Sequence, residues 1–226
     1  MSFRSWGLAF VVTAGIAYTG LYFAALGPKE AIAPKVVELH ITFAATPDDT
    51  KSTSDPRIKP VAGKGICSGL FIDDEGTILT ARHCTEGVDH MDVLTSDHSV
   101  YAASFVAKSN LHDLALIRVD RKNTPYFTLA QNVQQGENVN VLGNPMGETD
   151  VLSRGIIAKT AGDIVVVDCS VVPGNSGGPA YNDRGELVGV ATAVFVSAYG
   201  MTHLGVLQAP DAIRAFLKET IWRKHA

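Results

Sequence analysis

A serine set among glycines is the feature of this 226-residue sequence best suited to chemistry. Ser176 lies within residues 173–179 (PGNSGGP), where glycine and proline favour a tight loop over a helix or a central strand. Glycine permits backbone conformations that turn successive N–H groups toward one point beside the hydroxyl, as an oxyanion hole requires. Because a serine hydroxyl alone is a weak nucleophile, the chain must also supply a base and a group that orients it.

Two upstream residues are candidates for these roles. His83 follows the apolar run 77–81 (TILTA), where a strand would end in a polar turn and present the ring to a cleft. Asp113 precedes the apolar run 114–117 (LALI), which would carry its carboxylate inward, where an imidazole N–H is a natural partner. By position alone, either could instead be an ordinary surface or turn residue, so spacing leaves both assignments open.

The elements that must position these residues are short and β-rich. Turn signals at 73–76 (DDEG), 144–147 (NPMG) and 182–185 (NDRG) separate them, and no helices alternate with them, which indicates an all-β sandwich or barrel fold. We expect strands at residues 37–43, 65–72, 77–81, 88–94, 100–107, 114–119, 138–142, 156–160, 164–168, 187–195 and 203–207. Residues 46–60 are polar and proline-rich, which predicts a loop.

The end of the chain predicts a helix that packs on the β domain. Ile213, Phe216, Leu217 and Ile221 recur at helical spacing after Pro210, a favourable residue for the start of a helix. The basic residues behind them suit the negative end of the helix dipole. We interpret this helix as structural.

Near the N-terminus, residues 6–26 contain no charged side chain, and about 20 apolar helical residues cross a bilayer. Arg4 and the terminal amine precede the run, which places residues 1–5 in the cytoplasm and the remainder outside it. We therefore predict a transmembrane signal anchor at residues 6–27, followed by a linker at 28–34. A cleaved signal peptide and secretion remain the alternative, because residues 31–33 (AIA) resemble a cleavage site.

Composition restricts the partners. The net charge of −4 and the lack of a basic run argue against nucleic acid, whose phosphates require clustered Lys and Arg. The three cysteines are an odd number, so at least one thiol is unpaired or pairs with another chain. Their spacing does not suggest zinc, and we expect no metal.

Three motifs, in chain order, resemble those of the chymotrypsin-like serine peptidases. They are residues 80–84 (TARHC), 113–117 (DLALI) and 173–179 (PGNSGGP), and the last is closest to the bacterial high-temperature-requirement (Deg) and V8-like glutamyl-endopeptidase branches. The resemblance implies an all-β fold of two antiparallel six-stranded β-barrels with the site between them. The barrels would comprise residues 35–124 and 125–208, and the C-terminal helix residues 209–226.

The resemblance also assigns roles. Ser176 would attack the scissile carbonyl of a polypeptide, His83 would transfer the proton, and Asp113 would orient the imidazole. The oxyanion hole would be formed by Gly174, Asn175 and Ser176, with the first and last donating N–H groups, and no cofactor is needed. Trypsins have an aspartate where Asn175 stands, which captures a newly freed N-terminus. An uncharged Asn175 predicts an enzyme that is active without zymogen cleavage.

By the same resemblance, a P1 specificity pocket and a disulfide can be placed. The pocket would be lined by Ser170, Val171, Val172, Thr192, Ala193, Val194 and His203. Without an aspartate at its base, small or aliphatic P1 residues are expected, while His203 leaves an acidic P1 open. A Cys67–Cys84 disulfide would brace the histidine turn, leaving Cys169 unpaired; two separate buried thiols are the alternative.

Two other functions compete with this interpretation. Gly174, Ser176 and Gly178 also fit the nucleophile elbow of α/β-hydrolases, but that fold needs βα alternation and an acid and a histidine after the serine. Only 50 of the 226 residues follow Ser176. The other is a catalytically inactive, membrane-tethered binding module of the same fold.

We expect no PDZ domain after the second barrel, and the sequence does not indicate an oligomeric state.

Overall fold

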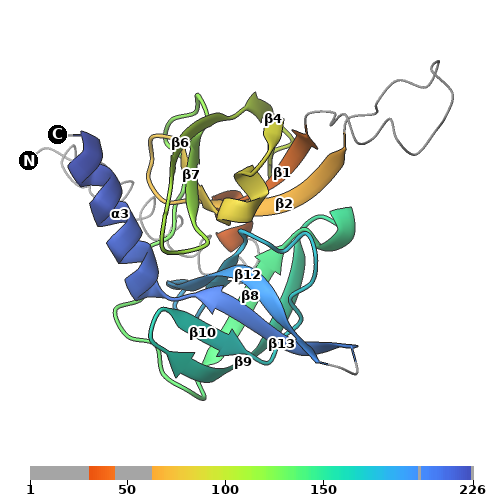
Figure 1. Ribbon diagram of the computed structural model, residues 1–226, viewed down its shortest axis with the longest axis vertical. Coiled ribbons are helices and arrows are strands. Elements are labelled where there is room, and N and C mark those ends of the chain that lie inside the picture. The colour runs from red at the N-terminus through yellow and green to blue at the C-terminus, as the bar shows by residue number, and fades with distance from the viewer. Residues whose placement is uncertain (1–30, 44–62, 198–199, 225–226) are drawn as a thin grey trace, which may run out of the picture.

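The computed structural model describes residues 31–43, 63–197 and 200–224, with only the backbone within 196–203 and 221–224. This part forms two antiparallel β-sheets, one above the other in Figure 1, with one long helix along their side. The first sheet contains β1 Val36–Phe43, β2 Lys64–Phe71, β3 Thr77–Thr80, β4 Val88–Thr95, β5 Val100–Ala102, β6 Ser104–Lys108 and β7 Ala115–Arg118. The second contains β8 Asn138–Gly143, β9 Val151–Ala161, β10 Ile164–Val167, β11 Pro179–Tyr181, β12 Leu187–Ser197 and β13 Gly200–Gln208.

The first sheet differs from the predicted six-stranded barrel. It has seven strands in the order β5-β4-β1-β2-β3-β7-β6 and is open. The predicted strand 100–107 is divided at Ala103, whose N–H donates to Met91 O at 2.9 Å. Before the bend, β5 pairs with β4 at one edge of the sheet. After the bend, β6 pairs with β7 at the opposite edge.

The second sheet confirms the prediction of a closed six-stranded barrel. Its order is β10-β13-β12-β11-β8-β9. Strand β11 was not expected from the sequence, because it has three residues and starts with a proline directly after the glycine-rich loop. It closes the barrel by pairing with β12 on one side and β8 on the other.

The predicted terminal helix is confirmed as α3 Pro210–Lys224. Its Ile213 and Phe216 are buried and join a core cluster with Leu70 and Leu79 of the first sheet and Leu142 of the second. Separate clusters fill the second barrel and the first sheet. The helix therefore packs where both sheets meet, and helps to fix them relative to each other.

The predicted transmembrane segment, residues 6–27, lies outside the described residues, as does the loop 46–60. Among the residues that are described, no helix is both long and apolar enough to span a bilayer.

Candidate active site

The structure brings His83 and Asp113 into direct contact. His83 lies in the short helix η3 Arg82–Thr85, one residue beyond β3, and Asp113 lies in the turn before β7. One carboxylate oxygen of Asp113 is 2.7 Å from His83 Nδ1, and the other accepts the backbone N–H of His83 at 3.0 Å. Because both oxygens hold the same residue, the ring and backbone of His83 are fixed together, and Nε2 is the nitrogen left for chemistry.

This contact changes the affinity of both groups for protons. The hydrogen bond to Asp113 raises the pKa of His83 above its ordinary 6.5, against the opposing effect of burial. Burial alone would raise the pKa of Asp113, but hydrogen bonds from the ring and backbone of His83 hold it below 3.8. At neutral pH, Asp113 is therefore an anion that stabilises a positive charge on the imidazole.

The turn that carries Asp113 is organised by Ser109. This side chain is buried, and its Oγ accepts the N–H groups of Leu111 at 3.3 Å and His112 at 3.1 Å. Its carbonyl accepts Arg82 Nη1 at 3.2 Å, which ties the turn to the helix of His83. The turn that carries the Asp113 carboxylate is therefore held by the Ser109 hydroxyl within it and by Arg82 from the helix of His83.

The predicted disulfide between Cys67 and Cys84 is present. It connects β2 to η3 immediately beside His83. The ligand atoms of Cys67, Cys84 and His83 lie within 4.8 Å of one another, but both sulfurs are committed to the disulfide and offer no thiolate to a metal. Cys169 is a buried free thiol whose pKa is raised by burial to about 11.

Ser176 lies in a loop whose backbone hydrogen-bonds to both sheets. Its carbonyl accepts Ser68 N of β2 at 2.8 Å, and Gly177 N donates to Ala191 O of β12 at 2.7 Å. Gly177 has φ +83°, and a Cβ there would lie 2.2 Å from Ser68 O. Only glycine fits this close approach. Among the described contacts, no hydrogen bond joins Ser176 Oγ to His83, and such bonds are often loose without substrate.

The residues before Ser176 form a type II turn. Asn175 N donates to Val172 O at 3.0 Å, with Pro173 and Gly174 in the central positions and Gly174 at φ +100°. Within the described residues, the N–H groups of Gly174 and Ser176 have no backbone acceptor. These are the two donors that the family resemblance assigned to the oxyanion hole. The side chain of Asn175 is buried, and its Oδ1 has no hydrogen-bond partner in the described part of the chain.

The residues predicted to line the specificity pocket lie on adjacent segments. Val171 is buried against Gly205, whose backbone pairs with Val194 of β12. Thr192 is also buried and donates its hydroxyl to Val206 O at 3.3 Å. The remaining members differ in exposure: Ser170 and Ala193 are exposed and Val172 is half-buried. His203 lies in β13, and its side chain is outside the described part of the structure.

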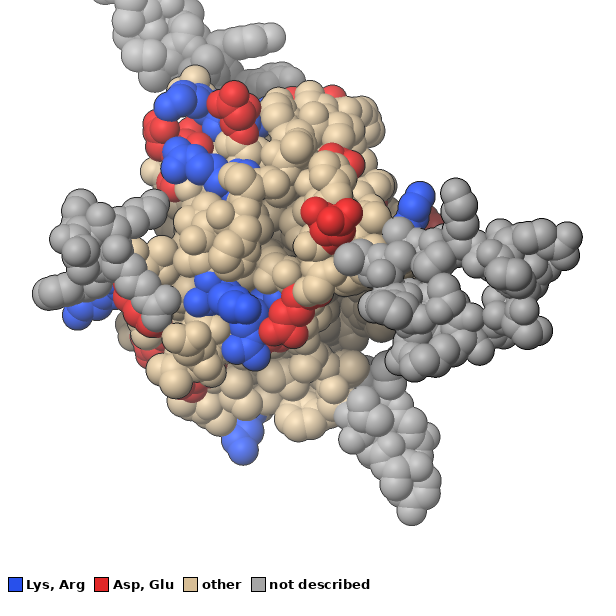
Figure 2. Space-filling view, turned by 45° about the horizontal axis from the view of Figure 1, so that its top comes forward, with Lys and Arg blue, Asp and Glu red and all other residues tan. Residues whose placement is uncertain are grey.

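Charged side chains of both signs are interspersed on the face shown in Figure 2. Several surface charges are paired, including Lys122 with Glu75 at 2.6 Å and Arg154 with Asp183 at 3.0 Å. Neither sign dominates this face.

Sequence reasoning missed two buried polar residues beside the Ser176 loop. Ser68 of β2 and Asn144, which follows β8, hydrogen-bond to each other and to the backbone of the loop and its surroundings. Asn144 was recognised only as part of a turn signal. No local pattern marks Ser68, because its partners are 76 and 106 residues away.

In sequence, this chain is similar to proteins named as periplasmic serine endoproteases. A DegP-like protein of Pseudomonas putida, named as a periplasmic serine endoprotease, is 32% identical over 151 residues, which are 62% of this chain and 32% of that protein. A protein of the same name from Rhizobium meliloti is 35% identical over 144 residues, covering 59% of this chain and 29% of that protein. This chain thus matches about a third of the length of these relatives.

Solved structures and a family model agree with this similarity. The HtrA-type protease AlgW with a decapeptide superposes with a TM-score of 0.70 at 26% identity, covering 87% of this chain and 68% of that one. A serine endoprotease from Yersinia pestis gives 0.70 at 24% identity with the same coverage. Because the model of the trypsin-like peptidase domain matches residues 67–190, more than half of the chain, this protein belongs to the trypsin-like peptidase family.

Proposed function

We propose that this protein is a serine endopeptidase that hydrolyses peptide bonds through Ser176, His83 and Asp113. The observation that carries the proposal is the two-point contact of Asp113 with His83, at 2.7 and 3.0 Å. The loop of Ser176 lies close by, because Ser176 O is 3.8 Å from Sγ of Cys84, the neighbour of His83. Family membership and the relatives named as serine endoproteases support it.

In the proposed reaction, Ser176 Oγ attacks the scissile carbonyl as His83 Nε2 takes its proton. Asp113 keeps the other ring proton on Nδ1 and stabilises the imidazolium. His83 then gives the proton to the leaving amine, which leaves an acyl-enzyme. Water, activated by the same histidine, hydrolyses this ester and restores Ser176.

The oxyanion formed in each step would be bound by the N–H groups of Gly174 and Ser176. Neither has a backbone acceptor in the described part of the chain, and losing one such donor typically lowers the rate by about 10²–10³. The turn has this form with an uncharged Asn175 buried behind it, which supports an enzyme that is active as synthesised. We propose that no N-terminal cleavage is needed.

The substrate is proposed to be a polypeptide with a small or aliphatic P1 residue, accommodated beside Ser170, Val172 and Ala193. An acidic P1 recognised by His203 remains the second specificity to test. We further propose that residues 6–27 anchor the chain and that the catalytic domain works outside the cytoplasm. The disulfide and the periplasmic relatives support that location, because disulfides persist in oxidising compartments.

The central experiment uses full-length protein and a biotinylated peptidyl diphenyl phosphonate with valine at P1. Wild type should be labelled on the peptide that contains Ser176, as located by mass spectrometry, whereas Ser176→Ala should not be. Ser104→Ala, at an exposed serine of β6 outside the proposed site, is the matched control and should be labelled. Labelling that persists in Ser176→Ala, or folded wild type that neither reacts nor cleaves any member of a P1-varied peptide library, would reject the proposal.

The same preparation tests activation. Untrimmed protein should cleave library peptides at the same rate as protein whose first 30 residues have been removed. Activity that appears only after trimming would show that the chain is a zymogen.

A further inference from the structure

The carbonyl groups of the two central residues of the turn before Ser176 accept hydrogen bonds from groups outside the loop. Pro173 O accepts Met146 N at 2.9 Å, and Gly174 O accepts Ser68 Oγ at 2.8 Å. Because a trans peptide unit is planar, the C=O of Pro173 and the N–H of Gly174 point in opposite directions. The bond to Met146 therefore directs the Gly174 N–H away from Met146. Rotation of this peptide unit would break that bond.

Ser68 is fully buried, and its hydroxyl is saturated. It donates to Gly174 O and accepts two hydrogen bonds from Asn144, from the backbone N and from Nδ2, both at 3.1 Å. A hydroxyl has one donor and two acceptor positions, so all three are used. The two bonds from Asn144 thus leave the hydroxyl proton one direction, toward Gly174.

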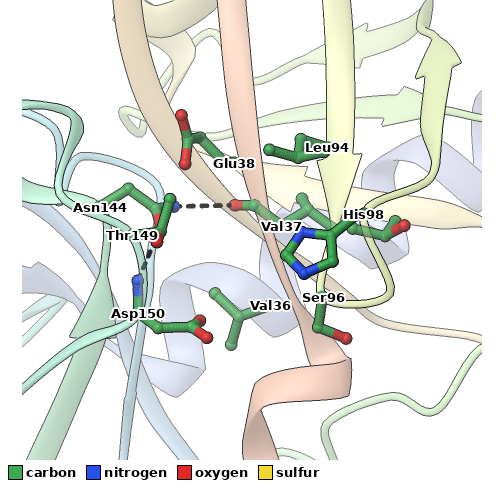
Figure 3. A pocket seen from close by; sticks show the side chains of 10 residues that line it. Val36, Val37, Glu38, Leu94, Ser96, His98, Asn144, Thr149 and Asp150 are labelled. Carbon is green, nitrogen blue, oxygen red and sulfur yellow. Dashed lines mark hydrogen bonds between the residues drawn. The ribbon is translucent and has the colours of Figure 1, made fainter.

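Asn144 connects this hydroxyl to the neighbouring segment. Its Nδ2 also lies 3.4 Å from Val37 O of β1, and its Oδ1 accepts Asp150 N at 3.2 Å, as the dashed lines in Figure 3 show. The side chain is 4% exposed and spans from the first sheet to the segment 144–150. This segment also contains Met146.

Met146 contributes its backbone rather than its side chain. The side chain is 81% exposed, yet the residue has φ +53°, an unfavourable region for methionine. Such a conformation persists only where surrounding contacts fix it. The hydrogen bonds of Asn144 and the bond from Met146 N to Pro173 O are contacts of this kind.

We propose that Ser68 and Asn144 are positioning residues for the oxyanion hole. Together they hold Gly174 O directly and Pro173 O through the Met146 amide, and so keep the Gly174 N–H free for the developing oxyanion. This inference rests on the proposed function. It adds two residues that touch no reacting atom but determine the orientation of a group that does.

The test compares Ser68→Ala and Asn144→Ala in full-length protein, using peptide p-nitroanilides with valine or alanine at P1. We expect kcat to fall by at least about tenfold and by no more than the ~10²–10³ typical of losing one oxyanion donor. KM should change by less than about threefold, because ground-state binding does not use the oxyanion interaction. Ser68→Cys, of similar volume but with a weak donor, should show the same pattern if Ser68→Ala folds poorly.

Affinity for a peptide boronic acid, which forms a tetrahedral adduct, should fall in parallel with kcat, whereas affinity for the product carboxylic acid should not. The double variant should lose little more than either single variant, because the two residues act as one unit. Thr124→Ala is the matched control: its buried hydroxyl donates to Asp73 O at 2.7 Å in the β2–β3 turn, and kcat should be unchanged. An unchanged kcat in folded Ser68→Ala, or a loss confined to KM, would overturn the proposal.

A structural measurement separates this inference from the proposed function. In a crystal structure of Ser68→Ala, the peptide between Pro173 and Gly174 should be rotated or present in two orientations, with the bond to Met146 N lost. This can be observed even if wild type proves inactive, so failure of the function does not decide the inference. A peptide orientation identical to that of wild type would refute it.

Discussion

Replacing both Cys67 and Cys84 with alanine should lower the free energy of unfolding by about 3 kcal/mol. The disulfide closes a loop with a sequence separation of 17. In the chain-entropy model, a loop of this length restricts the unfolded chain by roughly 10 cal/mol/K, or about 3 kcal/mol at 25 °C. Both side chains are almost fully buried, at 7% and 2% exposure, so alanine is the better replacement because serine would bury a new hydroxyl.

The assay is urea unfolding followed by fluorescence, with a parallel thermal scan. A loss of about 3 kcal/mol should lower Tm by roughly 6–12 °C in a chain of this size. Cys169→Ala is the control, because it removes a thiol of similar burial, 3% exposed, that closes no loop. Reduction of wild type by dithiothreitol should reproduce the double variant. If the double variant were no less stable than Cys169→Ala, the entropic reasoning would be refuted.

Two further predictions follow from the site and from the helix. Asp113→Asn should lower kcat by about 10⁴-fold and move the acidic limb of the pH–rate profile to lower pH, because the carboxylate that raises the pKa of His83 is gone; an unmoved limb in kcat/KM would contradict this cause. Phe216 of α3 is 2% exposed and lies in the core cluster shared with both sheets, so Phe216→Ala should lower the free energy of unfolding in urea by about 3–5 kcal/mol. Phe105→Ala, at 59% exposure, should lower it by less than about 0.5 kcal/mol. Equal losses would show that α3 is not docked as described.

Much of the fold was predictable because its signals are local. Alternating and apolar runs between turn residues located the strands of both sheets, and helical spacing after Pro210 located α3. The bend at Ala103 and the strand β11 were not predictable in this way. The bend depends on β5 pairing with β4 and β6 pairing with β7, which are contacts between distant parts of the chain. Strand β11 has only three residues, too few to show an alternating pattern.

The candidate site divides along the same line. The sequence by itself determined the candidates, because a serine between glycines, a histidine after a strand and an aspartate before one are chemical facts of the chain. The resemblance of the three motifs then assigned them the roles of a triad. The sequence also determined, through resemblance, the pairing of Cys67 with Cys84, which the structure confirms. These predictions depend on residue type, order and the resemblance of the motifs, all of which are present in the chain before it folds.

Only the tertiary structure decided how the reactive groups are held. Asp113 contacts both the ring and the backbone of His83 only because the fold brings two turns together. The hydrogen bonds of Ser68 join it to Asn144 and Gly174, which are 76 and 106 positions away. A buried hydroxyl has no periodic pattern, because its role depends on partners that the fold brings within hydrogen-bonding distance. For that reason Ser176, His83 and Asp113 could be predicted as a candidate triad from the sequence and its resemblance, whereas Ser68 and Asn144 could not be.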